Sequence, residues 1–460
     1  MVGNSIPGEK VDVVIVGAGF SGLQAAYDVH QAGYSCVVLE AKSRIGGRSY
    51  TASLKTEPGL IELGATWINE QTQPRVFELA KRFGLDFVEQ NGQTRSVIQD
   101  FDGQVWSERG ELIPQVLLPF LELMEKLQST IDVSNPGSGS TPEQDMTVDE
   151  WLQQNTTQWN REFISNGCAA LVGQDAKDLG LHYVMDYMKS GGGLNHLAGE
   201  GPDTAQHLKI KQGTTAIAQG LADALPKRSV LTDTPVASIT QLTSGDVLVT
   251  TKNGPAFESR KIILAIPTNT YTNISFAPPL PPAKRTIVSS TKAGIYAKAI
   301  ITYRRPWWRD HGLIGTFISM RGPINYSWEL ANEELQQYSI AAFIAGQSSS
   351  WWHALPTLKQ EEALLKNLVE MVPQADPNEV WAPFEINIQD WTKEEYIGGG
   401  PTSSMGPGDY ARYSQALREP YGNLYFTGGE LAFEWKGYLE GAVRSGSRAA
   451  AEVVEALKKG

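Results

Sequence analysis

Short apolar runs and a helical repeat predict a strand, a turn, a helix and a second strand at the start of the chain. Residues 13–16 form a continuous run of valine and isoleucine, and a second apolar run at residues 36–40 ends in Glu40. Between the two runs, Leu23, Ala26 and Val29 recur at helical spacing behind a glycine-rich turn. Runs this short are typical of buried strands, so the segment is expected to form a strand–helix–strand unit.

Farther along the chain, β-rich and helical segments alternate. Strands are predicted at residues 236–239, 247–251, 262–266, 297–303 and 340–344. A helix is predicted at residues 361–372, and residues 423–457 are expected to form a strand, a glycine turn and a long helix. This alternation predicts an α/β nucleotide-binding domain with a second, α+β domain inserted into it.

Two further patterns predict helices between these regions. Leu117, Leu121, Met124 and Leu127 fall at helical spacing. We interpret this apolar stripe as part of a core, because such stripes usually face the protein interior. Thr147, followed three residues later by Glu150, indicates a capped helix start.

Composition narrows the class of protein. The chain has 460 residues, with 41% hydrophobic and 20% charged residues, which suits two or three globular domains. Its formal net charge of -12 argues against a nucleic-acid partner, because such partners require clustered lysine and arginine. With no long apolar run, no hydrophobic leader and no Ser-Lys-Leu ending, we expect a soluble, intracellular, cytoplasmic protein without a membrane partner. A homo-oligomer is compatible with the sequence.

The cysteines and histidines give little sign of reactive or metal chemistry. Cys36 and Cys168 form no CxxC pair, and Cys36 lies in an apolar run, so it is expected to be a small core residue. The histidines lack HExxH spacing, and no GxSxG segment is present. Metal-dependent and hydrolase mechanisms are therefore not predicted.

A glycine-rich turn follows the first strand and supplies the clearest candidate binding site. It reads Gly17-Ala18-Gly19-Phe20-Ser21-Gly22. Gly17 permits a tight turn, Gly19 allows the backbone to approach a pyrophosphate, and Gly22 lets the helix pack near the strand. Glu40, at the end of the second strand, is placed to accept hydrogen bonds from a ribose diol. The turn by itself leaves NAD and FAD open.

The segment that follows Glu40 favours FAD. Residues 40–51 are basic and contain the pair Gly46 and Gly47, and they resemble the second FAD fingerprint of amine oxidases. By this resemblance Ala41, Lys42, Gly47 and Arg48 contact the cofactor, with Arg48 offering its guanidinium to phosphate or nearby backbone. NAD dehydrogenases do not carry such a segment.

Further segments resemble the flavin monoamine oxidase family, including its soluble fungal members, in the same order along the chain. They are residues 62–67, 181–192, 205–214, 234–236, 265–267, 276–280, 390–400, 427–430 and 435–442. The resemblance implies a Rossmann-type FAD-binding domain formed by residues 1–85, 205–290 and 391–460. An interleaved α+β substrate-binding domain would consist of residues 86–204 and 291–390. It also implies FAD contacts at Gly64, Ala65, Thr66, Val236, Gly429, Glu430, Tyr438 and Leu439.

The same resemblance assigns roles within the reaction site. Lys298 falls where the family has a lysine bound through water to flavin N5, and Tyr438 and Trp391 complete the expected catalytic set. Without the resemblance, a lysine in a strand would be expected to face solvent. The substrate-binding positions are Gln206, Tyr326, Trp67, Pro401 and Phe433.

Two residues depart from the mammalian family members. Pro401 stands where those enzymes have the tyrosine opposite Tyr438 in an aromatic cage, with Trp67 and Phe433 as candidate replacements. Gly400 stands where they tether the flavin through cysteine, so FAD is expected to be noncovalent.

The sequence therefore predicts an FAD-dependent amine oxidase whose partners are an amine and O2. The C–N bond would be oxidised to an imine while O2 is reduced to H2O2. One alternative is a flavin desaturase, isomerase or cyclase of specialised metabolism, because a fold does not determine chemistry. Another is an inactive FAD-binding protein. An L-amino acid oxidase is less favoured, because no arginine is assignable to a substrate carboxylate.

Overall fold

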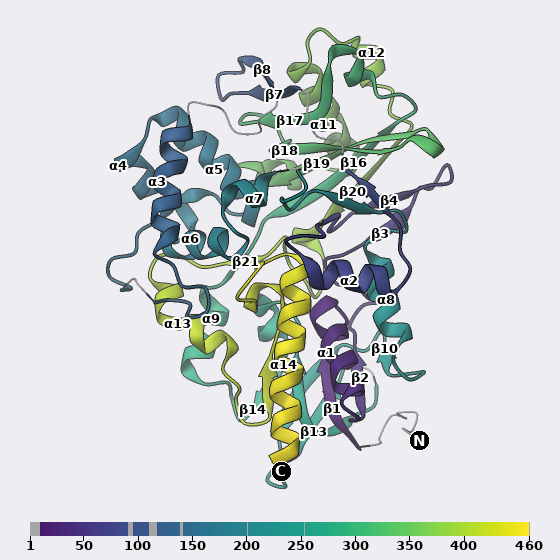
Figure 1. Cartoon of the computed structure of the whole chain (residues 1–460), viewed down its shortest axis with the longest axis vertical. Helices are drawn as coiled ribbons and strands as arrows, with labels where there is room; N and C mark the ends of the chain where they lie inside the picture. Colours follow the sequence, from purple (N-terminus) through teal and green to yellow (C-terminus); the bar gives the residue numbers. More distant parts are fainter. Residues whose placement is uncertain are drawn as a thin grey trace.

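The computed structural model describes residues 10–90, 95–109, 117–138, 141–199, 201–252 and 254–459. Figure 1 shows a nucleotide-binding-type sheet and its helices at one end, an antiparallel sheet at the other, and a group of helices alongside them. The first nine residues, which carry the expectation of no hydrophobic leader, lie outside the described ranges. Within those ranges, no helix is both long and apolar enough to cross a membrane.

The larger sheet has eight strands that come from three separate parts of the chain. Its order is β10 (Val230–Leu231), β2 (Cys36–Leu39), β1 (Lys10–Val16), β13 (Phe257–Leu264), β12 (Val247–Thr251), β11 (Val236–Gln241) and β14 (Ser275–Ala277), and β22 (Leu424–Phe426) also pairs with β13. β1 runs parallel to both β2 and β13, whereas β12 is antiparallel to its neighbours β11 and β13. The carboxyl ends of β1 and β2 therefore meet at one edge, where the glycine turn and Glu40 follow.

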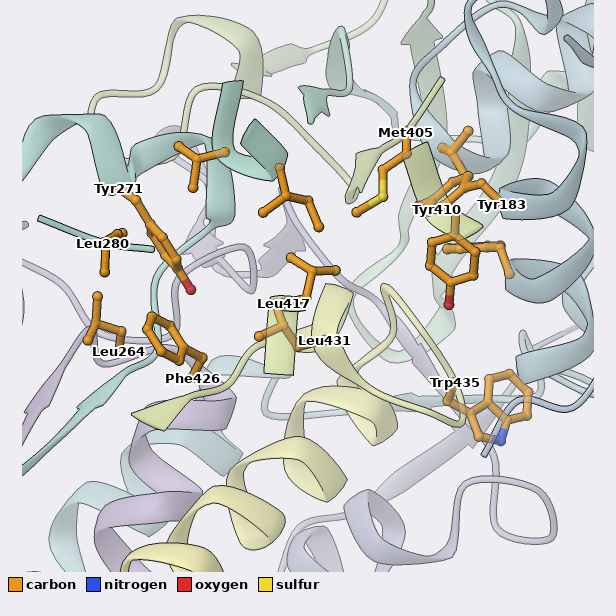
Figure 2. Close-up of a cluster of buried hydrophobic side chains, with 14 of the residues drawn as sticks. Tyr183, Leu264, Tyr271, Leu280, Met405, Tyr410, Leu417, Phe426, Leu431 and Trp435 are labelled. Atoms are coloured by element: carbon orange, nitrogen blue, oxygen red, sulfur yellow. The ribbon is translucent and has the colours of Figure 1, made fainter. Parts of the chain in front are cut away.

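The two faces of this sheet are buried in different cores. Val13 and Ile15 of β1 pack in a cluster with α1 (Phe20–Gln31) and α14 (Leu439–Lys459), while Val14 and Val16 pack in a cluster on the other face. Successive strand residues point to opposite faces, so the continuous apolar run of β1 serves both cores. α14 runs beside α1 in Figure 1. Figure 2 shows part of the other core, with Tyr271, Phe426 and Leu431.

A second, antiparallel sheet has the order β18 (Tyr326–Asn332), β19 (Gln337–Ala345), β16 (Tyr296–Tyr303) and β20 (Glu385–Asp390). On β16, Ala297, Ala299 and Ile301 pack into a core that includes residues of α11 (Thr357–Met371). Tyr296 and Ile300 lie in a different cluster. Because side chains alternate along a strand, Lys298 belongs to the face of Tyr296 and Ile300.

Helices form the remaining wall of the molecule. They are α3 (Leu118–Ser129), α4 (Val148–Asn155), α5 (Gln158–Val172), α6 (Leu181–Ser190), α7 (Leu194–Ala198), α9 (Pro282–Ser290) and α13 (Asp409–Arg418). α4 begins with the predicted capping box, in which the Thr147 side chain accepts from the Glu150 amide and the Glu150 carboxylate accepts from the Thr147 amide. α2 (Pro74–Arg82) packs against α14, and α8 (Thr215–Asp223) packs against α1.

Short strands and helices connect these layers. The minor sheets pair β3 (Thr51–Ser53) with β4 (Leu60–Glu62), β15 (Lys292–Ala293) with β21 (Ser403–Ser404), β9 (Leu208–Ile210) with β5 (Trp67–Ile68) and β6 (Phe87–Glu89), and β7 (Arg95–Gln99) with β8 (Val105–Arg109) and β17 (Leu313–Ser319). The short helices include η4 (Trp307–His311), η7 (Trp391–Lys393), η8 (Gly429–Leu431), α10 (Ser350–His353) and α12 (Pro377–Val380).

The predicted elements are confirmed, with boundaries shifted by a few residues in several of them. The strand expected at residues 262–266 is β13, which begins at Phe257 and ends at Leu264. Ala265 and Ile266 leave the strand before Pro267, whose nitrogen has no hydrogen to donate to a ladder. This early end lets Ala265, Ile266 and Pro267 line the cavity described next.

Candidate active site

A cavity of about 410 Å³ lies between the two sheets and the helical wall. Of the residues predicted for the site, those that line it are Gly17, Gly19, Phe20, Ser21, Glu40, Ala41, Lys42, Gly47, Arg48, Gly64, Ala65, Thr66, Trp67, Gln206, Val236, Lys298, Tyr326, Trp391, Pro401, Gly429, Glu430, Tyr438 and Leu439. Segments that are far apart in sequence thus meet at one site. Gly22 and Phe433 are not among its lining residues.

The glycine turn leaves open the space that a pyrophosphate needs. A Cβ on Gly19, which is the N-cap of α1, would have only the Gly47 Cα nearby, at 4.0 Å. A Cβ on Gly17 would approach the Ala265 oxygen to 2.8 Å, and Gly17 has a positive φ of 102°. A Cβ on Gly22 would come within 2.0 Å of the Gly17 oxygen, so Gly22 acts by letting helix and strand pack closely. The exposed helix amides beside Gly19 fit an anionic group.

Glu40 is held in place by the backbone around it. Its Oε2 accepts from the Ala18 amide at 2.8 Å and its Oε1 accepts from the Lys42 amide at 2.9 Å. Burial raises the pKa of this carboxyl above its ordinary value, and the two amide hydrogen bonds oppose that shift. The carboxylate is thus oriented at the strand end, where a ribose diol fits.

The basic turn after Glu40 uses its charges mainly on the protein itself. Lys42 forms an ion pair with Glu394. Arg48 was expected to contact either phosphate or nearby backbone. It donates through Nη1 to the Pro401 backbone oxygen at 2.7 Å. Arg44 lies 4.4 Å from the Tyr50 ring centre and 5.7 Å from that of Trp391. The turn is therefore clamped against the loop that carries Pro401.

Strand register brings three side chains into a row on the second sheet. Lys298 on β16 lies opposite Phe343 on β19, and Phe343 lies opposite Tyr326 on β18. Residues directly opposite on neighbouring strands share a face of the sheet, and all three line the cavity. Trp67 completes this wall with its ring centre 6.3 Å from that of Phe343.

Lys298 is buried, with 1% of its surface exposed, so the side chain does not face solvent. Its ammonium group donates to the Gly64 oxygen at 2.9 Å and to the Thr66 hydroxyl. Burial lowers the pKa of Lys298 below its ordinary value, and the charge of Glu62 opposes that shift. Glu62 is half-buried and accepts from the Thr214 amide at 2.7 Å and the Thr51 hydroxyl at 3.0 Å.

Tyr438 and Trp391 both line the cavity. Tyr438 packs edge-on against Trp435, with ring centres 5.2 Å apart. Trp391 donates through Nε1 to the Leu63 oxygen at 3.0 Å. Burial raises the pKa of Tyr438 above its ordinary value, so its hydroxyl is neutral at physiological pH.

Several cavity residues were not predicted from the sequence. They are Arg44, Tyr187, Tyr296, Trp328 and Phe343. Trp328 lies two residues after Tyr326 on β18, a strand that the sequence did not predict, so the alternation of side chains could not be applied to it. Tyr296 lies two residues before Lys298 on β16, and the same alternation places it on the face of Lys298. Phe343 carries no local signal, because only strand pairing and packing bring it to the site.

One expectation from the sequence is confirmed and extended here, and another is corrected. Leu117, Leu121 and Met124, interpreted as core, also line the cavity, because helical spacing reports burial but not what the stripe is buried against. Phe433 does not reach the cavity. It lines a separate pocket of about 300 Å³, and its ring centre lies 4.6 Å from the Arg418 guanidinium. The backbone between Phe433 and Tyr438 turns at Trp435, whose φ is 56°.

The cysteines also differ from one another in place. Cys36 is buried in the core between α1 and β2, as expected. Cys168 lines the cavity from α5, where burial raises the pKa of its thiol to about 12. The thiol is therefore uncharged near neutral pH and a weak nucleophile.

Charge in the cavity is unevenly distributed. Its lining carboxylates are Glu40 and Glu430, and both belong to the part formed by the cofactor turns. Glu430 accepts from the Thr268 hydroxyl at 2.7 Å. The helical side is lined by apolar residues, which include Leu121, Phe163, Ile164 and Leu171. In the part of the chain that the structure describes, no group of three or more His, Cys, Asp or Glu side chains could hold a metal ion.

The chain matches known proteins along almost its whole length. The family model of flavin containing amine oxidoreductases matches residues 20–454. The flavin-containing amine oxidase B of Homo sapiens is 31% identical over 98% of this chain and 87% of its own length. Cyclohexylamine oxidase from Brevibacterium oxydans IH-35A has a TM-score of 0.89 at 27% identity, covering 98% of this chain and 100% of that chain. Putrescine oxidase bound to putrescine also has a TM-score of 0.89, at 25% identity, covering 97% of this chain and 99% of that chain.

These matches agree with the fold and with the cavity. The predicted α/β fold, with a Rossmann-type FAD-binding part and an interleaved α+β part, is confirmed, as is FAD as the cofactor. The glycine turn and Glu40 both line the cavity, as the resemblance to an FAD-binding family leads one to expect. The chain therefore belongs to the family of flavin-containing amine oxidoreductases and is an FAD-dependent amine oxidase.

Proposed function

We propose that this enzyme oxidises apolar monoamines and discriminates against diamines. The observation that carries the proposal is that none of the described residues lining the helical side of the cavity is a carboxylate. A diamine brings a second ammonium group, which needs an opposite charge or hydrogen-bond acceptors when it leaves water. Leu121, Phe163, Ile164 and Leu171 offer neither. Cyclohexylamine, the substrate named for one relative, is of the preferred kind, and putrescine is not.

The cofactor and the protein have separate tasks in this reaction. When held by the glycine turn and Glu40, FAD would supply a two-electron acceptor for the hydride equivalent on the carbon beside the amine nitrogen, and O2 would take up two electrons and two protons as H2O2. The apolar wall favours the neutral amine, because burial disfavours its protonated form. The enclosed cavity keeps water away from the reacting carbon.

We assign roles to the three side chains expected to be catalytic. Tyr438 acts as one wall that orients the amine, and Trp391 supports the region where the flavin ring fits. Lys298 provides a positive charge whose position is set by the Gly64 oxygen and the Thr66 hydroxyl. In a dry site such a charge acts strongly on a developing negative charge, so Lys298 assists the reaction with O2.

Four further residues are assigned to substrate binding. Pro401, Tyr326, Trp67 and Gln206 form the substrate part of the cavity, where the small Pro401 leaves room for bulkier amines.

Residues 1–85, 205–290 and 391–460 form the FAD-binding domain, and 86–204 and 291–390 form the substrate-binding domain. All strands of the eight-stranded sheet fall in the first set, and all strands of the four-stranded sheet fall in the second. Because Gly400 has no side chain to form a bond to the flavin, FAD is held noncovalently.

Paired substrates test the proposed selectivity. Butylamine should exceed putrescine in kcat/KM by about 10²–10⁴, the ratio that corresponds to about 3–5 kcal/mol for an unpaired buried charge. H2O2 release with each amine at fixed pH measures this ratio. Equal or better turnover of putrescine would refute the selectivity.

A pair of variants on one helix adds a control. Leu121→Glu places a carboxylate in the cavity and should lower the ratio of kcat/KM for butylamine to kcat/KM for putrescine. Leu127→Glu changes a half-buried leucine of the same helix that does not line the cavity, and should leave the ratio unchanged. A similar response of both variants would mean that the ratio is not set by the cavity wall.

A further inference from the structure

A buried ion pair lies directly behind the cavity wall that carries Tyr438. Lys436, on the loop between η8 and α14, pairs with Asp186 on α6. The exposed fractions of the two side chains are 2% and 0%. Neither residue lines the cavity, and neither has a role in the reaction described above.

The pair is the centre of a network that joins three elements. The Tyr410 hydroxyl, from α13, donates to Asp186 Oδ1 at 2.6 Å. Lys436 also donates to the Phe433 oxygen of its own loop at 3.3 Å. Arg418, again from α13, donates to the Leu431 oxygen at 2.8 Å at the start of this loop. Figure 2 shows Tyr410 with its hydroxyl directed toward the part of the chain that carries Trp435.

Backbone contacts bring the same loop against α6. The Trp435 amide donates to the Ser190 oxygen at 2.8 Å, and the Lys436 amide donates to the Ser190 hydroxyl at 3.2 Å. Gly437, with a φ of 77°, packs so closely that a Cβ there would lie 2.7 Å from the Tyr187 hydroxyl. Tyr438 follows immediately and lines the cavity together with Tyr187.

Burial makes the two charges depend on each other. It lowers the pKa of Lys436 to about 8, and the negative charge of Asp186 opposes that shift. Within the described residues Asp186 Oδ2 has no hydrogen-bond partner, and Oδ1 receives both Lys436 and Tyr410. Removing either charge leaves the other without its charged partner in a dry environment, and of the described hydrogen bonds only those to Ser190 then join the loop to α6.

We propose that Lys436 and Asp186 are positioning residues whose ion pair holds the 432–438 loop against α6 and so sets the place of the Tyr438 ring. The inference rests on the proposed role of Tyr438 as a wall for the amine. Displacement of a reacting geometry by about 1 Å can cost 10²-fold in rate, so the pair acts on catalysis without touching substrate.

The test uses the FAD-loaded enzyme and the variants Lys436→Met, Asp186→Asn and the double variant. Lys284→Met is the matched control. Lys284 is also a buried lysine, but it donates to the Ala416 and Leu417 oxygens of α13 and does not line the cavity. Three quantities are measured: the visible circular dichroism of the resting flavin, the limiting rate of anaerobic flavin reduction by benzylamine, and the rate of reoxidation by O2. Hydrogen exchange of residues 432–438 is followed in the same samples.

The single variants should reduce their flavin about 10- to 100-fold more slowly, with altered flavin dichroism and faster exchange in the loop. Reoxidation should stay within about twofold, because Lys298 is untouched. The double variant should be no worse than the single ones, as expected for two residues acting through one contact. Lys284→Met should leave all four measurements close to wild type, whatever its thermal stability.

Wild-type dichroism and reduction rate in a folded, FAD-containing Lys436→Met would overturn the inference. If neither single variant folds, the double variant, which leaves no unpaired charge, is used instead. Wild-type dichroism and reduction rate in the folded, FAD-containing double variant would then overturn the inference. Failure of all three to fold would mean a role in stability alone and would also overturn it. If none of the amines tested reduced the flavin of the wild-type enzyme, the proposed function would fail. The flavin dichroism and the hydrogen exchange of residues 432–438 would still decide whether the ion pair places Tyr438.

Discussion

Replacing Gly19 by valine is expected to remove FAD binding while the apoprotein stays folded. Gly19 has a φ of -74°, which any residue adopts, and a Cβ there would meet only the Gly47 Cα at 4.0 Å. The protein itself therefore has room for the side chain. The added methyl groups would instead occupy the cavity space beside the first turn of α1, where the pyrophosphate of FAD must approach the backbone.

The magnitudes of the two effects differ widely. For the apoprotein, valine is a poorer N-cap than glycine by about 0.5–1 kcal/mol, which shifts Tm by no more than about 4 °C. For FAD, crowding costs about 1–3 kcal/mol and loss of a charge-assisted hydrogen bond about 1.5–3 kcal/mol. Together these weaken FAD binding by about 10²–10⁴-fold.

The assay titrates apoprotein with FAD by flavin fluorescence and compares thermal unfolding of the apoproteins. Gly22→Ala serves as the contrast, because its Cβ would lie 2.0 Å from the Gly17 oxygen and 3.0 Å from the Ala265 Cβ. This variant should lower the Tm of the apoprotein clearly. Full FAD binding by Gly19→Val, or a loss of apoprotein stability equal to that of Gly22→Ala, would refute the reading of the turn.

Three further predictions concern the cofactor and Lys298. Acid precipitation should release all the flavin into solution, because Gly400 cannot form a bond to it, and flavin retained in the washed pellet would contradict this. Lys298→Met, of similar length, should keep FAD and slow reoxidation by O2 by about 10²–10³-fold while reduction by substrate changes less, as stopped-flow measurement of each half-reaction will test. The Lys298 charge is present below its pKa, which burial lowers, so wild-type reoxidation should slow as pH rises through a midpoint below the ordinary lysine value of 10.5. Lys298→Met should show a flat profile, and the same slope in both proteins would assign the titration to another group.

Local patterns were sufficient for the cofactor turns. Gly17, Gly19 and Gly22 follow a short spacing between a strand and a helix that is visible in the sequence, and Glu40 ends a strand whose apolar run is visible there too. Such features depend on short-range geometry, so the strand–turn–helix unit and its ligand class could be predicted. The place of Lys298 was predicted only through resemblance to a family, because a strand lysine by itself favours a solvent-facing side chain.

The rest of the site was decided by tertiary structure. Phe343 reaches the cavity because β16, β19 and β18 pair in a particular register, and no local pattern specifies which residues lie opposite one another. The stripe of Leu117, Leu121 and Met124 is apolar whether it faces a core or a cavity, since both exclude water. Lys436 and Asp186 are 250 positions apart in sequence, and only the packing of the 432–438 loop on α6 makes their charges partners. The sequence by itself thus determined the dinucleotide-binding turn, whose requirements are local, and the α/β class, which follows from the alternation of strands and helices, while FAD followed from resemblance to a family. Long-range packing decided what surrounds the substrate and what holds those surroundings in place.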